Sequence, residues 1–139
     1  VGYLLAVTVV GAMAARTLAT TRLAECWIHT EDVAIPLGMA VPPTPRLWHI
    51  ARLAHRTLPY AVARAGAPAL QAPVVFELAG PDGLRTLGEP PADSACTVVR
   101  GPLLDLCRLA GQRAEAADTA LTADGPDATA VLALVRTFA

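Results

Sequence analysis

The stretch "PVVFELAGPDGLRTL", residues 73–87, decides the fold, because its apolar residues change from the spacing of a helix to that of a strand. Within residues 74–78 an inward apolar position recurs at every second residue, which is typical of a half-buried strand. The turn residues "GPDG" that follow predict a hairpin with a short second strand over 84–87. "ACTVVR", residues 95–100, predicts a third strand. Together they indicate a small antiparallel sheet.

Helical patterns flank this sheet on both sides in the sequence. Residues 44–66 predict one helix, which begins at a Thr-Pro pair, ends at a glycine and should kink or split at Pro59. After the sheet, "GPLLDLCRLAGQR", residues 101–113, predicts a helix with one apolar side. A last helix is predicted from Pro126 onward. Strands surrounded by helices in this order favour an α+β fold.

The N-terminal part is predicted to be helical and separate. Residues 4–36 are expected to form one helix, or two joined at a glycine, and Gly38 is expected to end it in the left-handed conformation. "VPPTP", residues 41–45, predicts a stiff extended linker. The chain is therefore divided into a terminal helix of a helical bundle, residues 1–40, and a small α+β domain, residues 41–139.

Composition excludes several classes of partner. The chain of 139 residues has a net charge of −1 and 11 basic residues, all arginines scattered singly, so nucleic acid is not expected to bind. The first fifteen residues are uncharged, too few to span a membrane and without the basic start of a signal peptide. Three cysteines without paired spacing favour reduced thiols and a cytoplasmic location. An exposed apolar N-terminal helix predicts self-association.

Three side chains that can bind metal or move protons share one stripe of the N-terminal helix. In "RLAECWIHTEDVAIPLG", residues 22–38, Glu25 and His29 lie about 40° apart around a helix axis, and Asp32 returns to within about 20° of Glu25. A carboxylate and an imidazole one turn apart can both reach one zinc ion. Asp32 can be a further ligand or can orient His29 by a hydrogen bond. The alternative is that all three are ordinary surface residues.

"RLAECWIHTEDVAIPLG", "VVFELAGPDG" and "VVRGPLLDLCRLAGQR" together resemble the mycothiol-dependent maleylpyruvate isomerase family. That resemblance implies a DinB-like helical bundle that binds a divalent metal, usually zinc, followed by a domain loosely similar to sterol carrier folds. The family's Glu-x-x-x-His pair corresponds to Glu25 and His29. A further histidine comes from an earlier bundle helix, and we expect this chain to begin after that helix.

The resemblance implies part of a metal-dependent enzyme that uses mycothiol as thiol cosubstrate in an isomerisation or S-transfer on a small molecule. Arg113 matches a Gly-Arg position of the isomerases, where a guanidinium can hold a substrate carboxylate. Its alternative is a helix-terminal arginine that faces the helix dipole. Two other interpretations stay open: a non-catalytic module of sterol-carrier type that binds an apolar ligand, and an inactive chain with an incomplete bundle.

Overall fold

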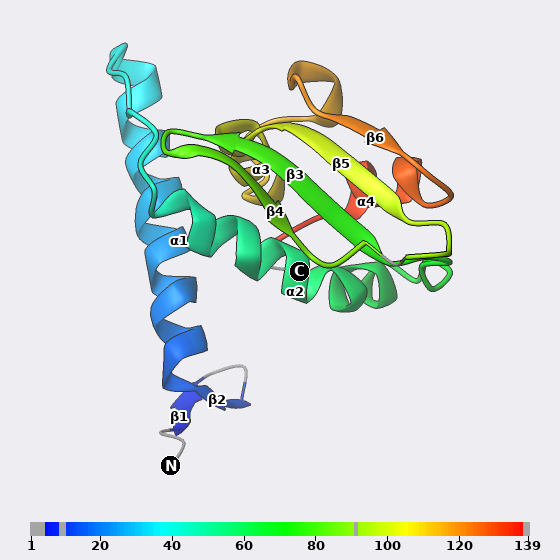
Figure 1. Cartoon of the computed structure of the whole chain (residues 1–139). Coiled ribbons are helices and arrows are strands. Elements are labelled where there is room, and N and C mark those ends of the chain that lie inside the picture. Colours follow the sequence, from blue (N-terminus) through cyan, green and yellow to red (C-terminus); the bar gives the residue numbers. More distant parts are fainter. Residues whose placement is uncertain (1–4, 9–10, 91, 138–139) are drawn as a thin grey trace. The chain divides into compact units, whose positions relative to one another are not determined.

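The computed structural model describes residues 5–8, 11–90 and 92–137, and the chain forms two compact units, Val1–Val41 and Pro42–Ala139. The boundary between the units falls in the proline-rich stretch that sequence analysis interprets as a linker. Helices and strands are both present, with the four-stranded sheet confined to the second unit (Figure 1). The α+β class is therefore confirmed.

The first unit opens with a strand pair where sequence analysis predicts helix. β1 (Leu5–Thr8) and β2 (Gly11–Ala14) pair antiparallel, with Leu5 opposite Ala14 and Thr8 opposite Gly11. The helical prediction is therefore wrong over these two strands. A short run without charged residues lacks the repeated polar positions that would distinguish the helical period, and β-branched residues favour strands. The apolar helix surface expected to drive self-association can begin only after β2.

One unbroken helix makes up most of the first unit. α1 (Ala15–Ala34) continues into a short 3₁₀ turn, η1 (Ile35–Leu37). Gly38 then adopts a φ of 68°, and its N–H donates to the carbonyl of Ile35. The left-handed conformation is open to glycine at no steric cost, so this residue ends the helical segment as predicted.

The second unit contains a sheet of four strands in the order β4-β3-β5-β6. These are β3 (Val74–Gly80), β4 (Gly83–Leu87), β5 (Thr97–Pro102) and β6 (Thr122–Asp124). β3 pairs antiparallel with β4 but parallel with β5, so the expectation of a purely antiparallel sheet is wrong. After the hairpin, the chain crosses back past β3 and adds β5 on its far side, where β5 runs in the same direction as β3.

Helices cover one face of this sheet (Figure 1). α2 (Leu47–Arg64) and α3 (Leu103–Ala110) pack against each other and against β3. A 3₁₀ turn, η2 (Ala116–Asp118), precedes β6, and α4 (Ala128–Leu134) packs beside that strand. Pro59 lies inside α2 without splitting it, contrary to one of the two expectations.

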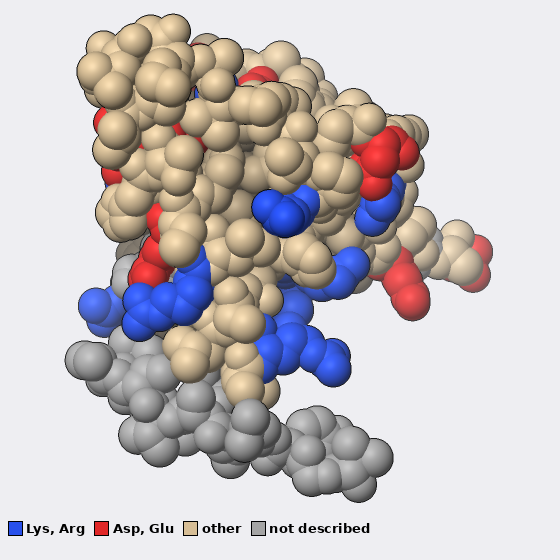
Figure 2. All heavy atoms as spheres, turned by 90° about the vertical axis from the view of Figure 1, so that its left-hand side faces the viewer, with Lys and Arg blue, Asp and Glu red and all other residues tan. Residues whose placement is uncertain are grey.

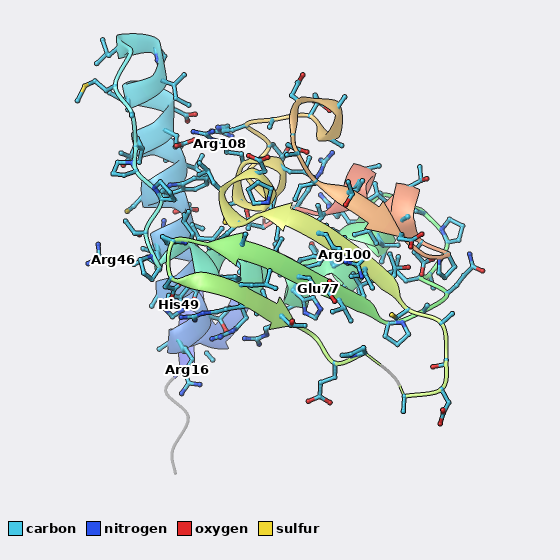
Figure 3. The ribbon with its side chains drawn as sticks, turned by 45° about the horizontal axis from the view of Figure 1, so that its top comes forward. Arg16, Arg46, His49, Glu77, Arg100 and Arg108 are labelled. Atoms are coloured by element: carbon cyan, nitrogen blue, oxygen red, sulfur yellow. The ribbon has the colours of Figure 1, made fainter. Side chains whose placement is uncertain are left out.

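The core of the second unit lies between the sheet and its helices. The side chains of Phe76, Leu78 and Val99 are completely buried. On the opposite face of the sheet, Arg100 donates from Nε to a carboxylate oxygen of Glu77 at 2.6 Å (Figure 3). That pair is exposed, so the face away from the helices is polar at its centre. The helices contribute further buried residues: Leu47, Ile50, Leu58, Leu103, Leu106 and Val131.

The β3–β4 turn is attached to α2 by a tryptophan. Trp48 donates from Nε1 to Asp82 at 2.8 Å, and the guanidinium of Arg85 pairs with the same carboxylate while lying 5.1 Å from the centroid of the tryptophan ring. The hydrogen bond from Trp48 and the charge of Arg85 hold the pKa of Asp82 below its usual value, against a smaller effect of desolvation. Gly80 fits beneath the ring because it has no side chain: a Cβ there would lie 2.7 Å from Trp48.

On the side of the molecule drawn in Figure 2, the charged side chains do not gather in a single region. Uncharged residues make up most of that side, and arginine and acidic side chains occur in several separate places. Within the part of the chain that the structure describes, no helix has both the length and the apolar character needed to cross a membrane.

Candidate functional site

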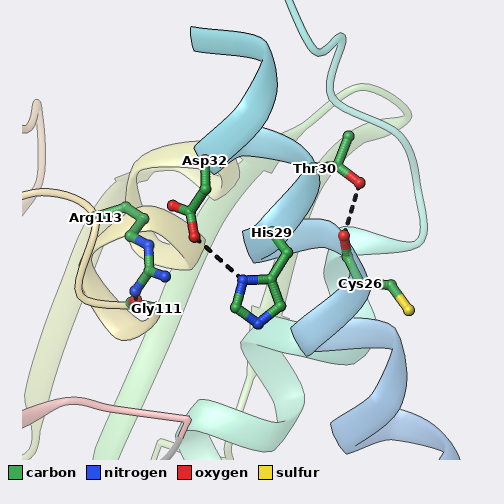
Figure 4. A network of polar contacts seen from close by, with 6 residues as sticks. All are labelled: Cys26, His29, Thr30, Asp32, Gly111 and Arg113. Atoms are coloured by element: carbon green, nitrogen blue, oxygen red, sulfur yellow. Dashed lines mark hydrogen bonds and ion pairs between the residues drawn. The ribbon is translucent and has the colours of Figure 1, made fainter. Parts of the chain in front are cut away.

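The predicted metal ligands lie along the exposed surface of α1. His29 is 72% exposed, and its Nδ1 lies 3.2 Å from a carboxylate oxygen of Asp32 (Figure 4). An imidazole held through Nδ1 presents its other nitrogen, Nε2, outward, which is the arrangement that hydrogen bonding imposes on many metal-binding histidines. The orienting role considered for Asp32 therefore has a geometric basis.

Glu25 points to a different partner. Its carboxylate accepts a hydrogen bond of 2.6 Å from Arg22, three residues earlier on the same helix. Such an exposed pair on a helix contributes little to stability, about 0.3–0.5 kcal/mol, so the carboxylate can turn to another cation at small cost. Among the described residues, no group of three or more His, Cys, Asp or Glu side chains gathers as a metal site. This stripe of α1 thus offers two side chains that can act as metal ligands, Glu25 and His29, and Asp32 is hydrogen-bonded to His29.

Three other polar side chains on this helix bond to its own backbone, those of Thr20, Thr21 and Thr30. Thr30 donates to the carbonyl of Cys26 at 2.7 Å (Figure 4), and Thr20 donates to the carbonyl of Arg16. Hydroxyls that bond the preceding turn are already engaged as donors. They therefore do not extend the pair of metal-binding side chains formed by Glu25 and His29.

Arg113 lies just past the C-terminus of α3. Its backbone N–H donates to the carbonyl of Arg108, and its guanidinium donates from Nη1 to the carbonyl of Gly111 at 2.9 Å. Gln112, between them, has a φ of 59°, the left-handed conformation that commonly ends a helix. The geometry fits the alternative of a helix-terminal arginine directly. The residue as a whole is exposed.

A groove of about 560 Å³ opens beside the C-terminal half of α2. The loop between α2 and β3 and the end of β4 complete it. Most of its lining is small or apolar: Leu58, Pro59, Val62, Ala63, Ala67, Ala69, Leu70, Ala72, Pro73 and Val74. The exceptions are His55, Gly88 and Glu89. Its size and apolar walls are typical of sites for small molecules.

His55 fixes the junction of the groove with the sheet. Its Nε2 lies 2.8 Å from the carbonyl oxygen of Val74, so this nitrogen carries the proton and donates. The ring meets Phe76 edge-on, with 5.1 Å between centroids. Gly88 lies directly against this contact: a Cβ there would be 2.7 Å from the Val74 oxygen and 2.9 Å from Nε2. Only glycine therefore fits at that point of the groove.

A buried carboxylate holds the groove's loop from behind. Asp127, 5% exposed, accepts hydrogen bonds of 3.0 Å from the backbone N–H groups of Gln71 and Ala72. Its own backbone N–H donates to the hydroxyl of Thr97 at 3.0 Å. The loop carries no helix or strand of its own, so these bonds set its path along the groove.

Sequence reasoning did not identify the groove. The sequence favours a core or surface position for His55, and the feature of the sequence that supports a bound apolar ligand is the uncharged inward faces of residues 74–78 and 103–110. Those two faces instead pack against each other, and Phe76 and Leu106 are both completely buried. The available signal was an alanine- and proline-rich loop, "APALQAP", directly after a helix containing Pro59.

Comparison with known proteins gives relatives but no function. Two uncharacterized proteins of Mycobacterium tuberculosis, one from strain CDC 1551 / Oshkosh and one from strain ATCC 25618 / H37Rv, are each 39% identical to this chain over 127 residues. The match covers 91% of this chain and 49% of each relative, so the chain spans about half the length of the curated relatives it matches. No protein-family model and no solved structure matches.

Proposed function

We propose that this chain is part of a metal-dependent enzyme that uses a thiol cofactor of the mycothiol type, with Glu25 and His29 as metal ligands. The observation that supports this proposal is the hydrogen bond between Asp32 and Nδ1 of His29 on an unbroken helix. That bond positions the imidazole and leaves Nε2 for an ion, while Glu25 stands one turn away with an exposed carboxylate.

The donor set fits zinc in kind. Imidazole nitrogen and carboxylate oxygen are both common zinc ligands, and a catalytic zinc site typically uses three protein ligands and keeps a fourth position open. Glu25 and His29 supply two of these three. The proposal therefore includes a third ligand from outside the described residues, and proteins twice as long as this chain, such as its relatives, have the length to provide it.

A bound divalent metal would lower the pKa of a coordinated thiol, so that the thiol is ionised at neutral pH. The residues of this chain would hold the ion and orient the imidazole. Arg113 would bind a carboxylate of the small-molecule substrate, because a guanidinium can hold a carboxylate through two hydrogen bonds. The reaction class is isomerisation or S-transfer. A cytoplasmic location suits this proposal, because the three cysteines are free thiols in the structure.

Zinc binding by the chain and its variants tests the metal site. In a protein that contains this chain together with the proposed third ligand, we expect one zinc ion per molecule in native mass spectrometry at micromolar zinc, and loss of that ion in both Glu25→Ala and His29→Ala. His49→Ala is the matched control, because His49 is another exposed helical histidine, located in the second unit. Asp32→Asn should weaken binding by about 10-fold, because it removes the carboxylate that orients His29.

Replacing zinc with cobalt tests whether the thiol binds to the metal. Adding mycothiol to the cobalt-loaded chain should produce sulfur-to-metal charge-transfer absorption, since a thiolate would enter the open position. Zinc binding that survives both Glu25→Ala and His29→Ala would refute the site. Metal binding without any thiol-dependent absorption would refute the thiol chemistry while leaving the metal site intact.

The groove favours a second candidate function, binding of a small apolar ligand without catalysis. Its specific support is the cavity of about 560 Å³ with walls made mainly of alanine, proline, leucine and valine. Native mass spectrometry of the freshly purified chain should then show a co-purified small molecule, and organic extraction should remove it. Absence of any bound molecule, together with no binding of added apolar compounds, would refute this function.

A further inference from the structure

The polar side chains that line the groove, His55 and Glu89, offer hydrogen-bond acceptors to a ligand. His55 uses the proton on Nε2 in its bond to Val74, so in the neutral imidazole Nδ1 is an acceptor. Glu89 adds a carboxylate at the rim, and within the described part of the chain it has no ion pair. No arginine contributes to the lining.

Pro59 adds one more acceptor. It lies inside α2 and has no N–H, so the carbonyl of His55, four residues earlier, lacks its normal helical donor. Both residues line the groove, which places that carbonyl on the groove's side of the helix. Donors are thus absent from the groove's side chains other than the one already engaged, and the rim carries negative charge.

We propose that the groove binds a small molecule with an apolar body and a protonated amine at one end. The apolar part would lie against Leu58, Val62 and Leu70, and the ammonium group would lie near Glu89 and His55. An ammonium group offers three donors and a positive charge, which complements lining side chains that offer acceptors and one carboxylate. This inference rests on the ligand-binding function proposed above and narrows its ligand to a chemical class.

Three probes of equal chain length separate the contributions of charge and apolar body. The chain, labelled with ¹⁵N, is titrated with hexylamine, hexanol and hexanoate, and binding is followed from the backbone amide shifts of residues 55–74 and 88–89. We expect hexylamine to bind tightest and hexanoate weakest. Glu89→Gln should weaken hexylamine about fivefold and leave hexanol unchanged, because an exposed ion pair is worth up to about 1 kcal/mol.

Two further variants control the experiment. Asp93→Asn removes another exposed carboxylate from the same inter-strand connection outside the groove, and it should leave all three affinities unchanged. Ala63→Phe places a large side chain at an exposed groove position on α2, where the fold can accept it, and it should abolish binding of all three probes.

The outcomes distinguish this inference from the function on which it rests. Equal binding of the three probes, lost in Ala63→Phe, would refute the preference for amines and leave the ligand-binding function standing. Shifts that persist in Ala63→Phe, or no shifts at the groove residues, would refute both. A hexylamine affinity that falls equally in Glu89→Gln and Asp93→Asn would show nonspecific charge attraction and overturn the proposed amine site.

Discussion

Removing the carboxylate of Asp127 should destabilise the second unit strongly. Asp127 is buried and accepts from the backbone N–H groups of Gln71 and Ala72, each at 3.0 Å. In Asp127→Ala both groups lose their acceptor, and an unsatisfied buried donor costs about 1–3 kcal/mol. Both amides are only partly buried, so water can reach them in part. We therefore expect a loss of about 3 kcal/mol in the free energy of unfolding.

Conservative replacements separate the contributions that individual hydrogen bonds make to this loss of stability. Asp127→Asn keeps one acceptor oxygen but replaces the other with a donor, so it should cost about 1–2 kcal/mol. Thr97→Val removes the hydroxyl that accepts from the backbone N–H of Asp127 at 3.0 Å, and it should also cost about 1–2 kcal/mol. Asp124→Ala, which removes an exposed carboxylate three residues earlier, should change stability by less than about 0.5 kcal/mol.

The assay is urea unfolding followed by tryptophan fluorescence in a Trp27→Phe background. The chain contains two tryptophans, so this background leaves Trp48, which lies in α2 of the second unit, as the single reporter. The urea midpoint should fall in Asp127→Ala while the denaturant slope stays unchanged. A loss below about 1 kcal/mol in Asp127→Ala would refute the reasoning, because the two amides would then have found other partners.

Two further predictions concern the β3–β4 turn. Gly80→Ala should destabilise the second unit by about 1–3 kcal/mol in the same urea assay, because the new Cβ would lie 2.7 Å from the ring of Trp48; an unchanged midpoint would contradict this packing. The pKa of Asp82 is lowered in the folded chain, so its contribution to stability is present above the unfolded pKa and is lost as pH falls through the folded value. Wild type should therefore lose more stability than Asp82→Asn between about pH 5 and pH 2, and parallel profiles for the two proteins would contradict the assignment.

The sequence predicted those helices and strands in which the apolar residues follow a clear helical or two-residue period. The strand at residues 74–80 alternates, and the helix at 103–110 carries its apolar residues on one side, and both were located from the sequence. Gly38 was expected to end the first helical segment and does so. Each of these signals lies within a few residues of the structure it specifies.

Two features of the fold depend on more than local pattern. The N-terminal run has no charged residues, and Thr8 alone does not distinguish a helical from a two-residue period, so the sequence did not predict β1 and β2 there. The position of β5 beside β3 depends on which edge of β3 is free after the hairpin forms. Neither the sequence of β5 nor that of β3 records this choice, so strand order was not predictable from either.

The same distinction separates the two candidate sites. Glu25, His29 and Asp32 lie within eight residues on one helix, so their spacing could be identified from the sequence, and the contact between His29 and Asp32 follows from that spacing. The groove combines a helix, a loop and the end of a strand that are up to 34 residues apart, and a buried carboxylate at residue 127 holds its loop. No short motif describes such an arrangement.

Metal binding and groove binding can be tested independently because the residues substituted in the two tests lie in different units. Glu25 and His29 belong to Val1–Val41, and every residue of the groove belongs to Pro42–Ala139. His29→Ala should therefore abolish zinc binding and leave hexylamine binding unchanged, whereas Glu89→Gln should weaken hexylamine binding about fivefold and leave zinc binding unchanged. A single substitution that abolished both would indicate loss of the fold, which the urea midpoint would reveal. The proposed metal binding and the proposed amine binding can therefore each fail without the other.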